Sequence, residues 1–144
     1  MLIYFVIVPI LIAVFLYLFP EKFLPEKIGK VIAIVAQSLV VVGALYLLFQ
    51  TQAYGTMVTN VGDFRSFLGI YLMADTLSAD FVLLTAIVFL AAAIFTVNES
   101  RSSLFWFLLF IWESALIGLF LTRDLFNIFV MAEVATVVVA VLLM

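Results

Sequence analysis

Two glutamates are the side chains best suited to chemistry in this sequence. Glu113 and Glu133 lie near the centres of two neighbouring apolar runs, residues 103–122 and 124–144. An ionised carboxylate at the centre of a bilayer costs about 2.5–3.5 kcal/mol on insertion scales, and more in simulations. Membrane helices therefore tend to keep such a residue where it has a partner, water or a proton to exchange. Since the chain contains no histidine and no cysteine, proton chemistry inside the membrane depends on these two carboxylates.

The composition places both glutamates in an integral membrane protein. Of the 144 residues, 69% are hydrophobic and 10% are charged, whereas apolar residues make up about half of an ordinary soluble domain. Several apolar runs reach the roughly 20 residues that a helix needs to cross a bilayer, and the alternation typical of barrel strands is absent. The predicted fold class is therefore an all-α membrane protein, with residues 1–144 forming one transmembrane domain.

The composition also limits cofactors and partners. Without cysteine and histidine the chain is poorly equipped to bind haem, zinc or an iron–sulfur cluster. We therefore expect no cofactor and no metal site. The hydrophobic composition predicts the lipid bilayer as the surroundings of the chain. The formal net charge of −3 is spread over short loops, so we expect no nucleic-acid partner. The amino-terminal run lacks a positive n-region and a cleavage site, which indicates a retained first helix.

Hydropathy predicts five membrane-spanning helices, at about residues 2–19, 28–49, 77–97, 103–121 and 124–144. Pro20 is expected to end the first helix and Pro9 to kink it. Four of the six basic residues fall in the loops after the first and third helices. The positive-inside bias then predicts a multi-pass protein of the cell membrane with its amino terminus outside.

The polar stretch between the second and third helices, residues 50–76, contains one short apolar element. Residues 67–73 are apolar and include a glycine, and residues 60–63 form a turn signal before them. This pattern predicts an extended or hairpin element against the outer membrane face. An irregular loop with an interfacial aromatic patch fits the pattern equally well.

A tight turn at Arg123 sets the two glutamates at equal depth. The fourth and fifth helices must be antiparallel neighbours, because residues 122–124 leave room only for a short turn. Glu113 precedes Arg123 by ten residues and Glu133 follows it by ten. At about 1.5 Å per residue, both carboxylates then lie about 15 Å from the turn, near the middle of a hydrocarbon core about 30 Å thick.

Contact between the two carboxylates depends on the direction in which each side chain points. If both face the shared interface, two like charges in a low dielectric cannot both ionise, and the pair would hold a proton near neutral pH. Ser114 and Thr136 are candidate hydrogen-bonding neighbours, although helical Ser and Thr often bond their own backbone. The alternative is a protonated glutamate that merely bonds across a helix interface.

Other polar residues near the spans are assigned structural roles. Asp124 lies about 180° around the fifth helix from Glu133 and is expected to cap that helix. Asn127 lies one turn further into the membrane and could bond a neighbouring helix. Gln37 and Ser38, in the second helix, are interpreted as residues that hydrogen-bond between helices.

Two aspartates flank the start of the third helix. Asp75 is expected to cap this helix. Asp80, one turn further in, is expected to be either solvated or paired with Arg65.

Two motifs give the sequence a family resemblance. Residues 119–134 read LFLTRDLFNIFVMAEV and resemble the motif T-G-D-L-F-N-L-F-V-x-x-E-V, and residues 69–78 read GIYLMADTLS and resemble G-I-x-L-x-x-D-x-L-S. These motifs are typical of the antiporter-like subunits of Mrp-type Na+/H+ antiporters, which are shared with complex I and membrane-bound hydrogenases. The chain is most similar to the D-type subunit of these antiporters, and the resemblance covers essentially its whole length.

The resemblance implies roles for particular residues. It identifies Glu133 with the family's essential fifth-helix glutamate, which works with a buried lysine on a later helix. It also implies an external hairpin before the third helix and an external amino terminus. Arg123 replaces the glycine of the motif, and Glu113 matches no family signature, so its role as a second proton carrier depends on its depth alone.

The chain is much shorter than the family's proteins, which have many more helices. Lys30, at the start of the second predicted span, is counted with the loop before it, and no basic residue is expected deeper inside a span. The lysine partner of Glu133 is therefore missing from this chain. The resemblance therefore implies an amino-terminal five-helix portion, either a natural split subunit or a truncated product. A partner subunit is expected to supply the lysine-bearing helices.

The favoured hypothesis is a membrane subunit of a multisubunit cation/proton antiporter. Glu133 would exchange protons, with H+ and Na+ as the transported ions and with Asp124, Asn127 and Thr136 as supporting residues. The chain is expected to be a transport subunit and not an enzyme, since redox catalysis would lie in partner subunits. The alternatives are a structural or assembly subunit, and part of a pumping module of a redox complex.

Overall fold

The computed structural model describes residues 1–18, 25–61 and 70–144. Pro20 and Arg65 lie outside the described residues, and so do the predicted end of the first helix and the predicted Arg65–Asp80 pair. Asp80 itself is exposed on the third helix.

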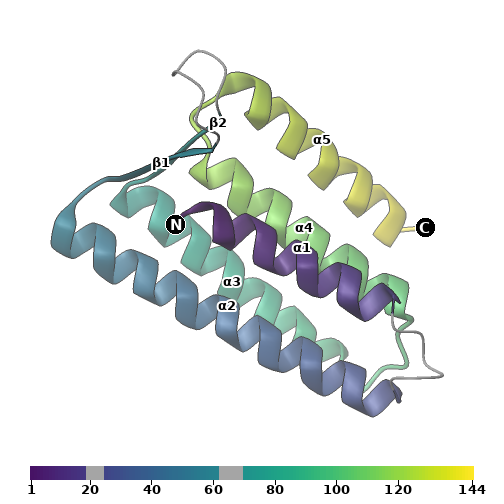
Figure 1. The fold of residues 1–144 in the computed structure, drawn as a ribbon. Coiled ribbons are helices and arrows are strands. Elements are labelled where there is room, and N and C mark those ends of the chain that lie inside the picture. Colours follow the sequence, from purple (N-terminus) through teal and green to yellow (C-terminus); the bar gives the residue numbers. More distant parts are fainter. Residues whose placement is uncertain (19–24, 62–69) are drawn as a thin grey trace.

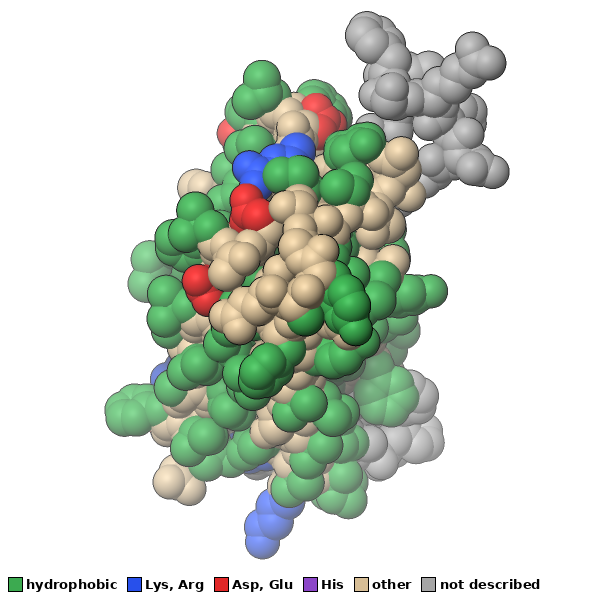
Figure 2. All heavy atoms as spheres, turned by 90° about the vertical axis from the view of Figure 1, so that its left-hand side faces the viewer, with side chains coloured by type: hydrophobic (Ala, Val, Ile, Leu, Met, Phe, Trp, Pro, Cys, Tyr) green, Lys and Arg blue, Asp and Glu red, His purple; other side chains and the backbone are tan. Residues whose placement is uncertain are grey.

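Five α-helices make up most of the described chain (Figure 1). They are α1 (Ile3–Leu18), α2 (Glu26–Tyr54), α3 (Thr76–Thr96), α4 (Ser103–Leu121) and α5 (Leu125–Leu142). Helices α2 to α5 are long and apolar enough to cross a membrane, and α1 is a shorter apolar helix of 16 residues. Hydrophobic side chains cover most of the face drawn in Figure 2. The prediction of an all-α membrane protein with five helices is confirmed.

Helix α2 differs from its predicted bounds at both ends. It continues to Tyr54, because Gln52 and Ala53 in the added turn have favourable helix propensities. It stops at Gly55, whose φ of 79° favours glycine and whose N–H donates to the Thr51 carbonyl at 3.0 Å. At the other end, Lys27 and Lys30 belong to the first two turns of α2. The assignment of both lysines to the loop before this helix is therefore wrong.

Helices α1 to α4 form a closed ring. Helix α1 packs on α4, α4 on α3, α3 on α2, and α2 on α1, so α2 and α4 face each other diagonally across the interior. Helix α5 packs on α4 outside this ring, as an antiparallel neighbour (Figure 1). The predicted pairing of the fourth and fifth helices is confirmed.

Two apolar clusters fill the ring. The cluster nearer the hairpin includes Leu2, Val40, Leu72, Val82 and Ile117. The cluster nearer the opposite end includes Ala13, Ala36, Phe89, Trp106 and Phe110. Each helix of the ring contributes to both clusters, so the part of the ring between them lies near the middle of the helices.

The polar stretch after α2 contains an antiparallel hairpin of β1 (Met57–Val61) and β2 (Ile70–Ala74), paired from Met57↔Ala74 to Val61↔Ile70. The predicted hairpin, and not the irregular loop, is confirmed where it is described; residues 62–63 of the predicted turn and 67–69 of the predicted apolar element lie outside the described residues. Residues 60 and 61 were expected in a turn, but they belong to β1 because the pairing continues through them. Leu72 also forms a β-bridge with Thr122, and the Arg123 N–H donates to the Tyr71 carbonyl at 3.0 Å. The hairpin is thus attached to the turn between α4 and α5.

Both predicted aspartate caps are confirmed. Asp75 accepts a hydrogen bond from the Ser78 backbone N–H at 2.7 Å, at the start of α3. Asp124 accepts one from the Phe126 backbone N–H at 3.2 Å, at the start of α5. In each case a carboxylate satisfies a backbone amide that the first helical turn leaves unpaired.

Candidate functional site

Glu113 lies at the centre of the helix ring and is fully buried. The Gln37 Nε2 group on α2 donates a hydrogen bond to Glu113 Oε1 on α4 at 2.5 Å. This bond joins the two helices that face each other diagonally, so it crosses the middle of the ring. Gln37 is also fully buried. Its predicted role as a residue that bonds between helices is confirmed.

The Gln37–Glu113 pair lies between the two apolar clusters. On α2, Ala36 belongs to one cluster and Val40 to the other, while on α4 the same holds for Phe110 and Ile117. The pair is therefore a polar layer with apolar packing on both sides. The low polarity around it makes an unpaired polar atom unusually costly there.

Ser114 binds elsewhere than predicted. Its hydroxyl donates to the Val6 carbonyl of α1 at 2.7 Å, instead of to either glutamate. Ser114 thus joins α4 to α1 beside the polar layer. Ser38 was also expected to bond between helices, but it donates to its own helix at Ile34.

Glu133 lies on the outer surface of α5 and its side chain is exposed. Helix α5 rests on α4 through Met131, whose Sδ atom would lie 3.0 Å from a Cβ added at Gly118. Glu133 is two residues from Met131, which is about 200° around the helix at 3.6 residues per turn. The carboxylate therefore points away from α4.

Glu113 and Glu133 do not form a carboxylate pair, because they do not both face the interface between α4 and α5. Gly118 marks the side of α4 that meets α5, and Glu113 lies about 140° around the helix from it. Glu113 consequently points into the ring, and its Oε2 atom has no hydrogen-bond partner among the described residues. The equal depth of the two carboxylates stays a prediction, since it depends on where the bilayer lies.

The three residues proposed to support Glu133 do not contact it through hydrogen bonds. Thr136 lies on the same face of α5 but donates to its own helix at Ala132, at 2.8 Å. Asn127 is buried and donates to the Thr122 hydroxyl at 3.0 Å, in the turn before α5, not to a neighbouring helix as expected. Asp124 acts as the cap described above. Asn127 and Asp124 therefore hold the start of α5 in place.

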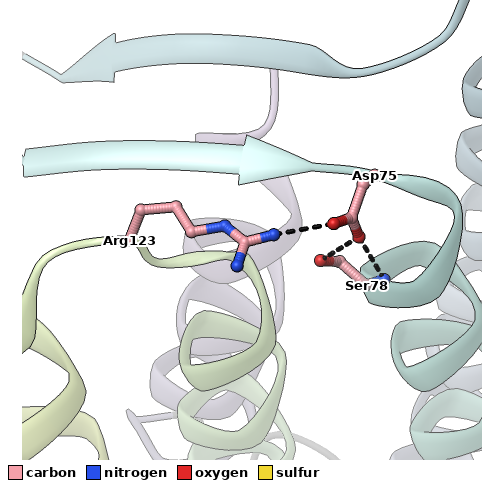
Figure 3. A network of polar contacts seen from close by, with 3 residues as sticks. All are labelled: Asp75, Ser78 and Arg123. Carbon is pink, nitrogen blue, oxygen red and sulfur yellow. Dashed lines mark hydrogen bonds and ion pairs between the residues drawn. The ribbon is translucent and has the colours of Figure 1, made fainter.

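A network of polar contacts beside the hairpin was not predicted from the sequence (Figure 3). Arg123 Nη2 donates to Asp75 Oδ2 at 2.7 Å, while Asp75 Oδ1 accepts from both the hydroxyl and the backbone N–H of Ser78, each at 2.7 Å. The hydrogen bonds from Ser78, together with the Arg123 charge, lower the pKa of the Asp75 carboxyl below its ordinary value of 3.8. The sequence did hold a signal, because Asp75 and Arg123 both lie on the predicted outer side.

The described residues offer little for metal binding. Within residues 1–18, 25–61 and 70–144, no three histidine, cysteine, aspartate or glutamate side chains come together as a metal site would require.

These features define the class of the molecule. It is a polytopic helical membrane protein with one carboxylate buried inside the bundle and another exposed on an outer helix. The chain matches no model of a known protein family. It is, however, similar to the D-type subunit of the Na(+)/H(+) antiporter of Alkalihalophilus pseudofirmus, with 29% identity over 133 residues that make up 90% of this chain. It spans only 26% of that relative's length.

The fold is similar to that of a much larger membrane subunit. A chain in the structure of the membrane-bound sulfane sulfur reductase, an archaeal respiratory membrane complex, matches 95% of this chain with a TM-score of 0.85 and 21% identity. This chain covers 28% of that one. The chain is thus similar in sequence to an antiporter subunit and in fold to a chain of a respiratory membrane complex, in line with the resemblance that its motifs indicate.

Proposed function

We propose that this chain is part of a membrane subunit of a multisubunit cation/proton antiporter, in which Glu133 exchanges protons. The related protein is named as a subunit of a Na(+)/H(+) antiporter, so we propose Na+ and H+ as the transported ions. The complex would lie in the cell membrane, with the amino terminus of this chain outside, as the loop charges favour.

The exposure of Glu133 is the observation that carries this proposal. Its carboxylate is presented on the side of an apolar helix that faces away from α4. In lipid such a group is unfavourable unless a cation, water or a bound proton compensates it. A partner subunit that covers this face with a lysine, as the family resemblance implies, would supply the cation. Movement of the partner's charge would then favour binding or release of the proton.

The proposed supporting residues act on the position of α5. Asp124 and Asn127 fix its first turn to the turn after α4, and Thr136 lies one turn beyond Glu133 on the same face. Glu113 is the proposed second proton carrier, since it is the one acidic residue fully buried among the described residues. Redox catalysis, if the complex performs any, would belong to other subunits.

The proposal is tested by Glu133→Gln in the assembled complex. Glutamine keeps the shape of the side chain but cannot titrate, so Na+-driven proton movement in everted membrane vesicles should fall at least tenfold. The amount of complex on native gels should stay the same. Val137→Ala, on the same exposed face of α5, is the matched control and should transport normally. Normal antiport by Glu133→Gln would refute the proposed role.

A structural or assembly role is the second candidate, because the exposed apolar face of α5 could serve only to dock a neighbouring subunit. That role predicts that Glu133→Ala reduces the amount of assembled complex, while any complex that forms transports normally. A redox-driven pumping module is the third candidate, suggested by the fold shared with a chain of a respiratory complex. It predicts that proton movement in vesicles requires an electron donor, whereas an antiporter needs only an ion gradient.

A further inference from the structure

The hydrogen-bonding groups of Gln37 and Glu113 do not balance. A glutamine side chain has an NH2 donor and a carbonyl acceptor, whereas an ionised carboxylate only accepts. The Gln37 amide group donates to Glu113 Oε1, which leaves two acceptors, Gln37 Oε1 and Glu113 Oε2. Both of these atoms are buried and have no hydrogen-bond partner among the described residues. The pair is thus short of one donor.

Turning the amide of Gln37 over does not remove the shortage. The carbonyl oxygen would then face Glu113 Oε1, and two acceptors at that distance need a hydrogen between them. In both orientations, a single proton on the carboxyl group of Glu113 provides the missing donor.

The charged and titratable side chains around this pair lie away from it. On α2 the charged residues precede Gln37 by about two turns or more. On the elements that pack against α4, the titratable groups are exposed or at the surface; they are Tyr4 and Tyr17 on α1, Asp80 on α3, Tyr71 on β2 and Glu133 on α5. An ionised Glu113 would therefore be a charge buried between two apolar clusters, which is strongly unfavourable.

We infer that Gln37 and Glu113 form a neutral acid–amide pair at neutral pH, in which the protonated Glu113 donates to the Gln37 carbonyl and accepts from its NH2 group. This inference deepens the proposed role of Glu113 as a second proton carrier. When the proton leaves, the acid becomes a carboxylate that still accepts from Gln37, so one amide serves both states. Gln37 is a positioning residue, and Glu113 holds its proton independently of Glu133, which points in another direction.

Infrared spectroscopy of the protein in lipid bilayers tests the pair directly. A protonated carboxyl group has a C=O stretching band distinct from carboxylate bands, and 13C labelling of glutamate carboxyl groups shifts it without any mutation. We expect a labelled carboxylic acid band at pH 7 that is absent in Glu113→Gln and unchanged in Glu133→Gln. In Gln37→Leu the band should move to higher frequency, because the acid has lost its acceptor. Ser38→Ala, the neighbouring residue that bonds its own helix, is the matched control and should leave the band in place.

The outcomes separate the inference from the proposed antiport. A wild-type spectrum at pH 7 with no labelled carboxylic acid band would overturn the inference, even if Glu133→Gln abolishes transport. A band that survives in Glu113→Gln, or that keeps its frequency in Gln37→Leu, would equally overturn it. Conversely, normal transport by Glu133→Gln would sink the proposed function and leave the acid–amide pair unaffected.

Discussion

The contacts of Asp75 should hold the hairpin, the start of α3 and the turn after α4 together, and Asp75→Ala should release them. Asp75 accepts two hydrogen bonds from Ser78 and one from Arg123, each at 2.7 Å. The Arg123 backbone N–H in turn donates to Tyr71 of β2. A change at one carboxylate therefore reaches elements that are far apart in the sequence (Figure 3).

The magnitude follows from the two roles of the carboxylate. Loss of an aspartate N-cap costs about 1 kcal/mol. The ion pair is partly exposed, with Arg123 44% and Asp75 33% accessible, so solvent screening limits it to about 0.2–1 kcal/mol. Asp75→Ala, which removes both roles, should cost about 1–2 kcal/mol. Asp75→Asn keeps an acceptor oxygen for the cap and should cost less, similar to Arg123→Ala, since each removes only the charge interaction.

Hydrogen–deuterium exchange in bilayers or detergent measures this local stability, because exchange reports the opening of individual segments. A loss of about 1.4 kcal/mol corresponds to roughly tenfold faster exchange. The Ser78 amide should exchange faster in Asp75→Ala than in Asp75→Asn, whereas the Arg123 amide should exchange faster in both. Equal protection of the Arg123 amide in wild type and Asp75→Ala would refute the idea that the side-chain pair stabilises the turn.

The same network should depend on pH in a defined direction. The pKa of Asp75 lies below 3.8 in the folded protein, chiefly because of the hydrogen bonds from Ser78 and also because of Arg123. A carboxyl group with a lowered pKa stabilises the folded state fully above its unfolded pKa, and this stabilisation is lost as the pH falls through the folded pKa. Protection of the Ser78 amide, corrected for intrinsic exchange, should therefore be constant from neutral pH to about pH 5. It should weaken below that in wild type and much less in Asp75→Asn.

Substitutions at three further positions probe the packing of α4 and the start of α5, and each is checked by the free energy of unfolding in mixed micelles. Gly118→Leu should cost about 1–3 kcal/mol, because its side chain would overlap Met131, whereas Gly118→Ala should cost less since the end of Met131 can move. Ser114→Ala should cost about 1 kcal/mol through loss of the bond to Val6. Asn127→Leu should lower stability by a similar amount, about 1 kcal/mol, by removing the side chain that anchors the first turn of α5. No loss in any of these variants would contradict the packing described for that residue.

The features that depend on local sequence could be predicted, and those that depend on side-chain direction could not. Apolar length identified the helices, and the aspartates before α3 and α5 were recognised as caps because their effect is confined to one helical turn. The turn at Arg123 correctly made α4 and α5 neighbours. The rotation of α5 about its axis relative to α4 could not be predicted, because it depends on the contact between Gly118 and Met131.

The partner of Glu113 illustrates the same limit. Gln37 was recognised as a residue that bonds between helices, and Glu113 as a buried carboxylate, yet nothing in their spacing relates two residues 76 positions apart. Their bond follows from the order of four helices around a ring, which places α2 and α4 diagonally. Hydropathy contains no information about that order.

Both carboxylates belong to apolar helices, where an unpaired charge is unfavourable, but their surroundings differ. The rotation of α5 about its own axis determines the surroundings of Glu133. Because the small surface of Gly118 lets Met131 approach α4, Glu133 turns outward and its carboxylate remains available to a partner. Glu113 instead turns into the ring, where Gln37 can satisfy it only if a proton is present. A charge introduced from outside can therefore act directly on Glu133, while Glu113 is shielded by two apolar clusters.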